Sequence, residues 1–327
     1  VADVWLNGRH ITRHAGAFTR FRAELNAALD FRGQNVLIVR ADNSDPQPGS
    51  STADTIPLLG DFFIYGGLYR PARLVSVAQS HIALDDFGGP GIYATPRVLA
   101  DGSAAIATLV RLTGARDEQR LIVEVLDADG RTVAGSYTTI DAGQLQATDK
   151  LTVLNARLWN GRADPYLYRL VATLEEDGRE IDRVEQPLGI RTLRFDPDRG
   201  FFLNGKHLPL RGVSRHQDWL GKGWALSDED HRRDMALIAE MGANSIRVAH
   251  YPQAALWFDL ADRNGMAVWA EVPFVNKLSF ADAEASPALI ANARVQMTEM
   301  IRQYFNHPSI ITWGIGNEVD IDLAFKR

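Results

Sequence analysis

The chain begins with short alternating runs of apolar and polar residues, a pattern typical of β-strands with one buried face. Runs at residues 3–7, 35–41 and 72–77 are separated by turn-forming residues such as Asn7-Gly8, Asn43 and Gly66-Gly67. We therefore expect residues 1–78 to form part of a β-sandwich.

Residues 79–190 contain evenly spaced strand patterns joined by hairpin signals. An Asp-Gly pair between two alternating runs predicts a tight hairpin turn, and the chain has such pairs at Asp129-Gly130 and Asp177-Gly178. The strands expected around them lie at residues 120–126, 132–135, 167–175 and 179–184. A second sandwich of about 100 residues, immunoglobulin-like, fits this spacing.

After residue 190 the pattern changes to strands that alternate with helices. A hairpin at Asn204-Gly205 comes first. Strands are then expected at 208–213, 244–250 and 266–272 and in the apolar run that ends at Glu318, with helices from Ser227, at 254–264 and at 287–305. Such alternation predicts a parallel sheet.

The first of these helices has recognisable ends. Ser227 and Asp230 resemble a capping box, and Gly242 is expected to close the helix. Met235, Ile238 and Met241 follow the helical period and predict its buried stripe.

Polar residues follow each expected strand of this last region. Arg215 and His216, Arg247 and His250, Glu271 and Glu318 all fall at carboxyl ends, which meet at one edge of a parallel sheet. A single histidine at such a place is more often structural, but four strand ends together predict a binding rim. Because indole faces suit the apolar faces of sugar rings, Trp219, Trp224 and Trp313 near these ends suggest a carbohydrate site, although core packing is the more common role of any single tryptophan.

The segment NHPSIITWGIGNE, residues 306–318, carries the strongest catalytic candidate. It predicts a buried strand that delivers Asn317 and Glu318 to the rim. Glu318 is the expected general acid, and Asn317 can donate hydrogen bonds to a substrate hydroxyl. The alternative, an exposed glutamate with no catalytic role, is the more common case for an isolated carboxylate.

Composition narrows the class of protein. The 327 residues are 46% hydrophobic and 23% charged, with a net charge of −6, which is ordinary for a globular protein. No dense basic run indicates nucleic acid, and no 18-residue apolar span indicates a membrane. The chain has no cysteine, which excludes disulfides and thiolate chemistry but leaves bacterial cytoplasm or periplasm equally open.

Several motifs, in order, give the chain a close resemblance to glycoside hydrolase family 2, the retaining exo-acting β-galactosidases, β-glucuronidases and β-mannosidases. They are LLGDFFIYGGLYRP (58–71), LRGVSRHQD (210–218), NSIRVAHYP (244–252), VWAEVP (268–273) and the segment 306–318. The resemblance implies a multidomain fold of two β-sandwich domains followed by the first half of a TIM (β/α)8 barrel. The expected domains are a partial jelly-roll sugar-binding sandwich at 1–78, an immunoglobulin-like sandwich at 79–190 and the half-barrel at 191–327.

The resemblance also implies roles for particular residues. Glu318 would be the acid/base and Asn317 the contact to the hydroxyl next to the anomeric carbon. His216, Arg247 and His250 would bind or brace the terminal sugar, as would Asp61, unless Asp61 only caps a turn. Glu271 is expected to form hydrogen bonds within the barrel. Because VPFVNK departs from the magnesium-binding pattern of the best-known β-galactosidases, we expect neither metal nor cofactor.

Retention of configuration needs a second carboxylate about 5–5.5 Å from the first, and in the family this nucleophile lies on a later barrel strand. The chain is therefore expected to be a fragment that lacks the start of the first sandwich and the second half of the barrel, and to hydrolyse little alone. Its half-barrel would have unpaired edge strands, which favours a homo-oligomer.

A β-galactoside is the favoured substrate, because the Asp61 loop and AEVPFVN look closer to bacterial galactosidases than to glucuronidases. A β-glucuronidase or β-mannosidase of the same family is the first alternative. A non-catalytic carbohydrate-binding fragment is the second.

Overall fold

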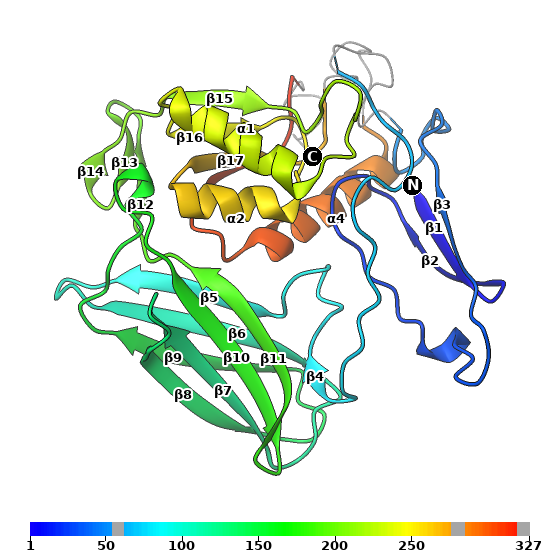
Figure 1. The fold of residues 1–327 in the computed structure, drawn as a ribbon, viewed down its shortest axis with the longest axis horizontal. Coiled ribbons are helices and arrows are strands. Elements are labelled where there is room, and N and C mark those ends of the chain that lie inside the picture. Colours follow the sequence, from blue (N-terminus) through cyan, green and yellow to red (C-terminus); the bar gives the residue numbers. More distant parts are fainter. Residues whose placement is uncertain (54–61, 276–284, 319–327) are drawn as a thin grey trace.

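The structure is a computed structural model, and it describes residues 1–53, 62–275 and 285–318. Its first region is an antiparallel sheet in the order β2-β1-β3, formed by β1 (Ala2–Leu6), β2 (Arg9–His14) and β3 (Leu37–Ala41) (Figure 1). A short 3-10 helix, η1 (Asn26–Ala28), lies between the second and third strands.

The strand predicted at residues 72–77 does not form. These residues have no regular secondary structure, and Leu74 is 81% exposed. A run of apolar residues becomes a strand only where a neighbouring backbone takes its hydrogen bonds, and none of the described strands pairs with this segment. That prediction was wrong.

The second region consists of two sheets around one apolar core (Figure 1). One sheet has the order β11-β10-β7-β8; in the other, β6 pairs with β4, β5 and β9. Alternate residues of β6 are buried, as a sheet with one core face requires. The bounds are β4 (His81–Ile82), β5 (Ile92–Val98), β6 (Ala104–Thr113), β7 (Gln119–Leu126), β8 (Thr132–Ile140), β9 (Gln146–Val153), β10 (Tyr168–Glu176) and β11 (Arg179–Leu188). The 3-10 helix η2 (Gly161–Ala163) lies between β9 and β10 in the chain.

The third region opens with a small antiparallel sheet, β12 (Leu193–Asp196), β13 (Gly200–Leu203) and β14 (Lys206–His207), with the predicted turn at Asn204-Gly205. A four-stranded parallel sheet follows in the order β15-β16-β17-β18. Its strands are β15 (Gly212–Arg215), β16 (Ser245–Val248), β17 (Ala267–Glu271) and β18 (Ile310–Gly314). The parallel sheet was predicted, although β15 begins four residues later than expected.

Helices α1 (Asp228–Glu240), α2 (Ala255–Asn264) and α4 (Pro287–Tyr304) bury apolar side chains against one face of this sheet. The capping box of Ser227 and Asp230 is present, and Gly242 adopts a φ of +85° just after α1. Met235 is buried as predicted, but Met241 is 67% exposed. It lies past the last helical turn, so its side chain does not follow the stripe.

Helix α4 and the residues just after it also connect this sheet to the two N-terminal regions through buried polar side chains. Glu299 accepts hydrogen bonds from Thr19 and lies 2.8 Å from His14 Nε2, both in the first region. Asn306 exchanges hydrogen bonds with the backbone of Ile92 and Ala94 in the second. Among the described residues, no helix is long and apolar enough to cross a membrane.

Candidate active site

A polar cluster lies at the carboxyl ends of β16, β17 and β18. Arg247 donates to both carboxylate oxygens of Glu271 at 3.0 Å, and His250 Nδ1 lies 2.7 Å from Glu271 Oε1. Glu271 is fully buried, so these two partners compensate for its lost hydration. The expectation that Glu271 forms hydrogen bonds is confirmed.

Strand register explains why these side chains meet. Arg247 of β16 lies beside Trp269 of β17, and Glu271 is two residues further along the same strand. Side chains two residues apart share a face, so Arg247 and Glu271 both project from the face opposite the helices. Trp269, which the sequence analysis did not single out, is 45% exposed on this face, with the Arg247 guanidinium 5.5 Å from its ring centroid.

Asn317 joins the cluster from the end of β18. Its side-chain oxygen accepts from Arg247 Nη2 at 2.7 Å, and its backbone N–H donates to Phe274 at 2.8 Å. An amide whose oxygen accepts from an arginine offers its NH2 group to a ligand. This orientation is the one required to donate a hydrogen bond to a substrate hydroxyl.

Glu318 follows directly and is exposed, with a φ of +53°. A left-handed conformation is uncommon for a residue other than glycine, and such residues are enriched at functional sites. The chain thus has a carboxylate one residue after Asn317, and the catalytic role of Glu318 stays a proposal.

The two predicted histidines lie together. The rings of His216 and His250 are 5.2 Å apart, edge to face, and Phe62 lies 4.8 Å from the first and 5.7 Å from the second. Phe62 comes from the first region of the chain, so two distant segments build one wall of the site. Sequence reasoning missed it, although the aromatic run in residues 58–71 was the available signal. Asp61, the predicted contact beside it, lies outside the described residues.

Comparison with known proteins agrees with this arrangement. The family profile described as "Glycosyl hydrolases family 2, TIM barrel domain" matches residues 197–326, and the profile "Glycosyl hydrolases family 2" matches residues 90–191. The chain belongs to glycosyl hydrolase family 2.

Relatives within family 2 carry two activity names. A beta-glucuronidase from Bacteroides fragilis is 39% identical over 98% of this chain and 46% of its own length. The solved structure of an FMN-binding beta-glucuronidase from Facaelibacterium prausnitzii L2-6 matches with a TM-score of 0.88 and 38% identity, over 97% of this chain and 47% of that one. A putative beta-galactosidase from Bacteroides fragilis matches with a TM-score of 0.89 and 36% identity, over 99% and 47%. The chain therefore spans about half the length of these family 2 relatives.

The tryptophans predicted to line the family 2 sugar site are engaged in packing. Trp313 lies beside Ala270 in the sheet and packs against the core under the helices, on the face opposite Arg247. Trp224 is buried among the rings of Phe18 and Tyr251, and Trp219 donates to Asp234 at 3.0 Å. Substrate contact by Trp313 stays a prediction that no described contact supports.

One group among the described residues could hold a metal ion, formed by Asp259, Asp262 and His307. His307 Nδ1 lies 2.6 Å from one Asp262 oxygen, and the Ser309 N–H donates to the other at 3.0 Å. Burial acts to lower the pKa of His307, but the charge and hydrogen bond of Asp262 outweigh it and raise that pKa. Since both Asp262 oxygens already bind protein groups, we interpret the pair as an anchor between α2 and the start of the 306–318 segment.

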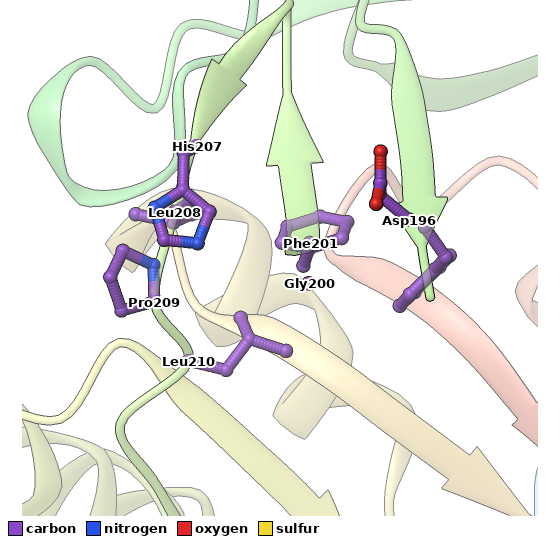
Figure 2. Close-up of a pocket in the computed structure, with 8 residues that line it drawn as sticks. Asp196, Gly200, Phe201, His207, Leu208, Pro209 and Leu210 are labelled. Carbon is purple, nitrogen blue, oxygen red and sulfur yellow. The ribbon is translucent and has the colours of Figure 1, made fainter. Parts of the chain in front are cut away.

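A pocket of about 340 Å³ lies elsewhere in the molecule, beside β12, β13 and β14 (Figure 2). Residues 208–210, which line it, precede β15, so it lies toward the amino ends of the parallel strands and away from the polar cluster. Its one carboxylate, Asp196, already pairs with Arg194. The pocket offers an apolar surface but not the acid–base groups that family 2 chemistry needs.

Proposed function

We propose that this chain supplies the acid/base half of a retaining exo-β-glycosidase whose first substrate class is a terminal β-D-glucuronide. The observation that carries the proposal is Asn317, held by Arg247 within the cluster and directly followed by Glu318. The substrate class is supported by relatives named beta-glucuronidase, with β-galactoside, the main expectation from the sequence, placed second.

The proposed domains follow the same family assignment. Residues 1–78 would be a partial jelly-roll sandwich, 79–190 an immunoglobulin-like sandwich and 191–327 the first half of a (β/α)8 barrel. The two-sheet core of the second region and the four parallel strands of the third support this division, as do the matched ranges 90–191 and 197–326.

Each residue of the cluster then has a chemical task. Glu318 protonates the leaving oxygen and afterwards takes a proton from the attacking water. The Asn317 NH2 group donates to the hydroxyl next to the anomeric carbon. His216 and His250 bind the terminal sugar, and Arg247 holds Asn317 and His250 in place.

Glu271 is a poor candidate for the nucleophile. Both of its oxygens accept from cationic or imidazole donors in a fully buried position, which stabilises the carboxylate and blocks its lone pairs. We therefore assign the nucleophile, as in the family, to a later barrel strand, about 5–5.5 Å from Glu318 in the completed site.

The test uses the complete gene product that carries this chain, assayed on aryl β-D-glucuronide, β-D-galactoside and β-D-mannoside. We expect the glucuronide to be hydrolysed fastest and Glu318→Gln to lower turnover by about 10²–10⁴-fold. Azide, a nucleophile that needs no general base, should partly restore turnover of the variant. Glu240→Gln, an exposed change at the end of α1, is the matched control.

Hydrolysis that survives Glu318→Gln undiminished would contradict the catalytic assignment. Faster hydrolysis of the galactoside or mannoside would contradict the substrate class alone. Sugar binding without hydrolysis of any of the three would favour a carbohydrate-binding protein instead.

A further inference from the structure

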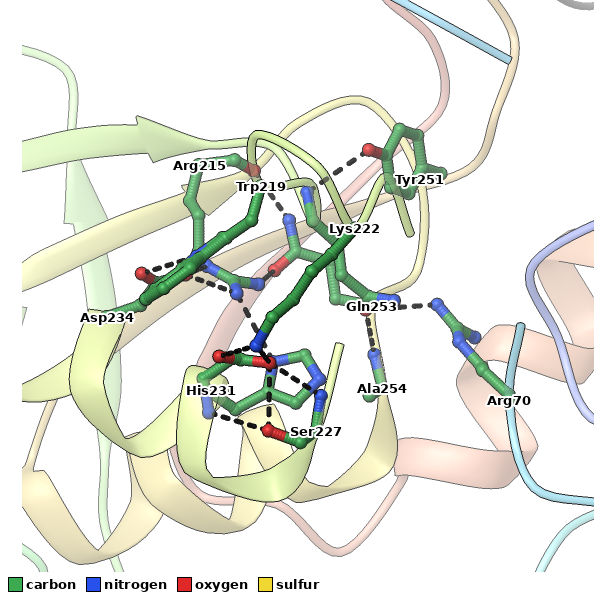
Figure 3. A network of polar contacts seen from close by, with 12 residues as sticks. Arg70, Arg215, Trp219, Lys222, Ser227, His231, Asp234, Tyr251, Gln253 and Ala254 are labelled. Atoms are coloured by element: carbon green, nitrogen blue, oxygen red, sulfur yellow. Dashed lines mark hydrogen bonds and ion pairs between the residues drawn. The ribbon is translucent and has the colours of Figure 1, made fainter. Parts of the chain in front are cut away.

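We propose that Arg70, a residue of the first region, is a positioning residue for the sugar site of the third region. This inference rests on the proposed function. Arg70 Nη2 donates to the Gln217 side-chain oxygen at 3.3 Å, the dashed line that leaves Arg70 in Figure 3. It also donates to the Pro252 carbonyl at 2.8 Å, and Nη1 donates to the Phe18 carbonyl. One guanidinium thereby binds both loops that carry the site histidines.

Gln217 joins the two loops to each other. Its side-chain oxygen also accepts from the Ala254 N–H at 2.7 Å, and its own N–H donates to the Tyr251 hydroxyl at 3.2 Å (Figure 3). Gln217 is only 1% exposed, so water does not substitute for these contacts. The loop after β15 and the loop after β16 are thus joined by hydrogen bonds to the buried Gln217. Arg70, which lies outside the sheet, donates to the same Gln217 side chain.

Aromatic side chains enclose the same point. Phe18 stacks on Tyr251 with ring centroids 4.2 Å apart, and Trp224 packs 5.0 Å from Phe18 and 5.1 Å from Tyr69. Arg70 Nε is buried and has no hydrogen-bond partner among the described residues. The guanidinium makes three hydrogen bonds in this aromatic setting, and their loss would leave the buried carbonyl groups of Phe18 and Pro252 unpaired.

The consequence for the site follows from chain position. His216 immediately precedes Gln217, and His250 lies two residues before Pro252. Their 5.2 Å ring contact and their common contact with Phe62 depend on how the two loops are placed relative to each other. Arg70 touches neither histidine ring by any described contact, so its effect on substrate would be indirect, through the placement of those rings.

The experiment compares three variants of the complete gene product. Arg70→Met removes the donors, Arg70→Lys keeps the charge but only one donor nitrogen, and Arg162→Met is the control. Arg162, of the second region, also donates to two carbonyls of the third region, those of Ala239 and Ala243, which lie at the C-terminal end of α1. We expect Arg70→Met to raise KM for the best aryl glycoside at least about tenfold with a smaller change in kcat, Arg70→Lys to restore part of the affinity, and Arg162→Met to leave KM within about twofold.

A second measurement does not depend on hydrolysis. With 13C-labelled histidine, the ring signals of His216 and His250, assigned through His→Gln variants, should shift in Arg70→Met and stay in place in Arg162→Met. If the wild-type protein hydrolyses no glycoside, the proposed function fails while these signals still decide the positioning role. An unchanged KM with unchanged ring signals in a folded Arg70→Met protein would overturn the inference, as would equal changes in Arg162→Met.

Should Arg70→Met fail to fold, Gln217→Met tests the same connection between the two loops. It removes the acceptor that Arg70 and Ala254 share but leaves the Arg70 contacts to Phe18 and Pro252. The expected result is again a raised KM and shifted histidine signals. A folded Gln217→Met protein with wild-type KM and signals would count against the proposal.

Discussion

Two arginines lie side by side at the carboxyl edge of the parallel sheet and have different surroundings. Arg215 is the last residue of β15, and Arg247 is the third residue of β16. In the register of the two strands Arg215 pairs with Val248, and Arg247 pairs with Ser214. Because successive residues of a strand alternate between faces, the two guanidinium groups project from opposite sides of the sheet.

On the helix side, Arg215 is enclosed. Its side chain is 6% exposed and donates to Asp234 at 2.8 Å and to Gln253 at 2.6 Å (Figure 3). Its guanidinium also lies 3.9 Å from the ring centroid of Trp257. On the other side, the Arg247 side chain is 30% exposed, and its partners are those of the proposed sugar site. The comparison shows that sheet face, rather than residue type or nearness to a strand end, separates an arginine of the polar cluster from one enclosed by the helices.

The largest effect on stability is expected at the enclosed network. Asp234→Asn removes the charge that compensates buried Arg215, and breaking a buried pair in this way lowers the free energy of unfolding by about 3 kcal/mol. Urea unfolding of the purified protein measures the change. Turnover per folded molecule should stay within about threefold of wild type, because the network lies behind the sheet.

Asp228→Asn on the same helix is the matched control. Asp228 pairs with Arg232 at 3.7 Å, but both side chains are more than half exposed. Exposed pairs contribute little, so this change should cost less than about 1 kcal/mol. Equal losses in the two variants would show that the Arg215 network is no more important for stability than a surface pair.

The sequence predicted features whose cause is local. The capping box at Ser227 and Asp230, the glycine after α1 and the hairpin turn at Asn204-Gly205 all depend on residues within a few positions of each other, and all are present. Strand order in the parallel sheet also followed from β-α alternation. The family motifs placed Arg247, His250 and Asn317 at one edge, where the structure brings them into contact.

The sequence could not predict which face each side chain takes. The first parallel strand was expected at 208–213 but forms at Gly212–Arg215, and an uncertainty of one residue in a strand exchanges its two faces. For this reason Arg215 was predicted to share a rim with Arg247, and the face that Trp313 takes on β18 could not be predicted from the sequence either. Phe62 and Arg70 were missed for a different reason, because contacts across some 150 to 190 residues leave no periodic pattern.

The next prediction makes the same substitution, arginine to lysine, on both faces of the parallel sheet. Lysine keeps the positive charge but cannot donate two parallel hydrogen bonds to one carboxylate. Arg247→Lys should therefore lose part of the hydrogen bonding to Glu271 and Asn317. We expect kcat/KM on the best aryl glycoside to fall about 100-fold, which corresponds to about 2.7 kcal/mol of transition-state stabilisation. Steady-state assays of the complete gene product measure it.

Arg215→Lys serves as the partner experiment. It should reduce the free energy of unfolding, because a lysine neither stacks on Trp257 nor binds Asp234 through two nitrogens, while kcat/KM stays within about threefold. Comparable losses of kcat/KM in both variants would refute the proposal that the Arg247 face serves catalysis and the Arg215 face serves stability.

The smallest expected effect is a dependence of the free energy of unfolding on pH, and it arises in the buried network around Arg215. Arg215 Nη2 lies 3.2 Å from His231 Nδ1, and because a guanidinium can only donate, this nitrogen accepts and the ring is neutral. Burial, followed by the charges of Arg215 and Arg70, lowers the pKa of His231 to about 4. The unfolded chain binds a proton near pH 6.5 whereas the folded protein does not, so the stabilisation is present above pH 6.5 and is lost as the pH falls toward 4.

Wild type and His231→Gln, unfolded in urea at pH 7 and at pH 4.5, separate this contribution from other titrating groups. We expect the wild-type protein to lose on the order of 2 kcal/mol more than the variant between the two values. A difference that does not change with pH would mean that His231 titrates in the folded protein as it does in the unfolded chain, and hence that the Arg215 side of the sheet is as open to water and protons as the Arg247 side.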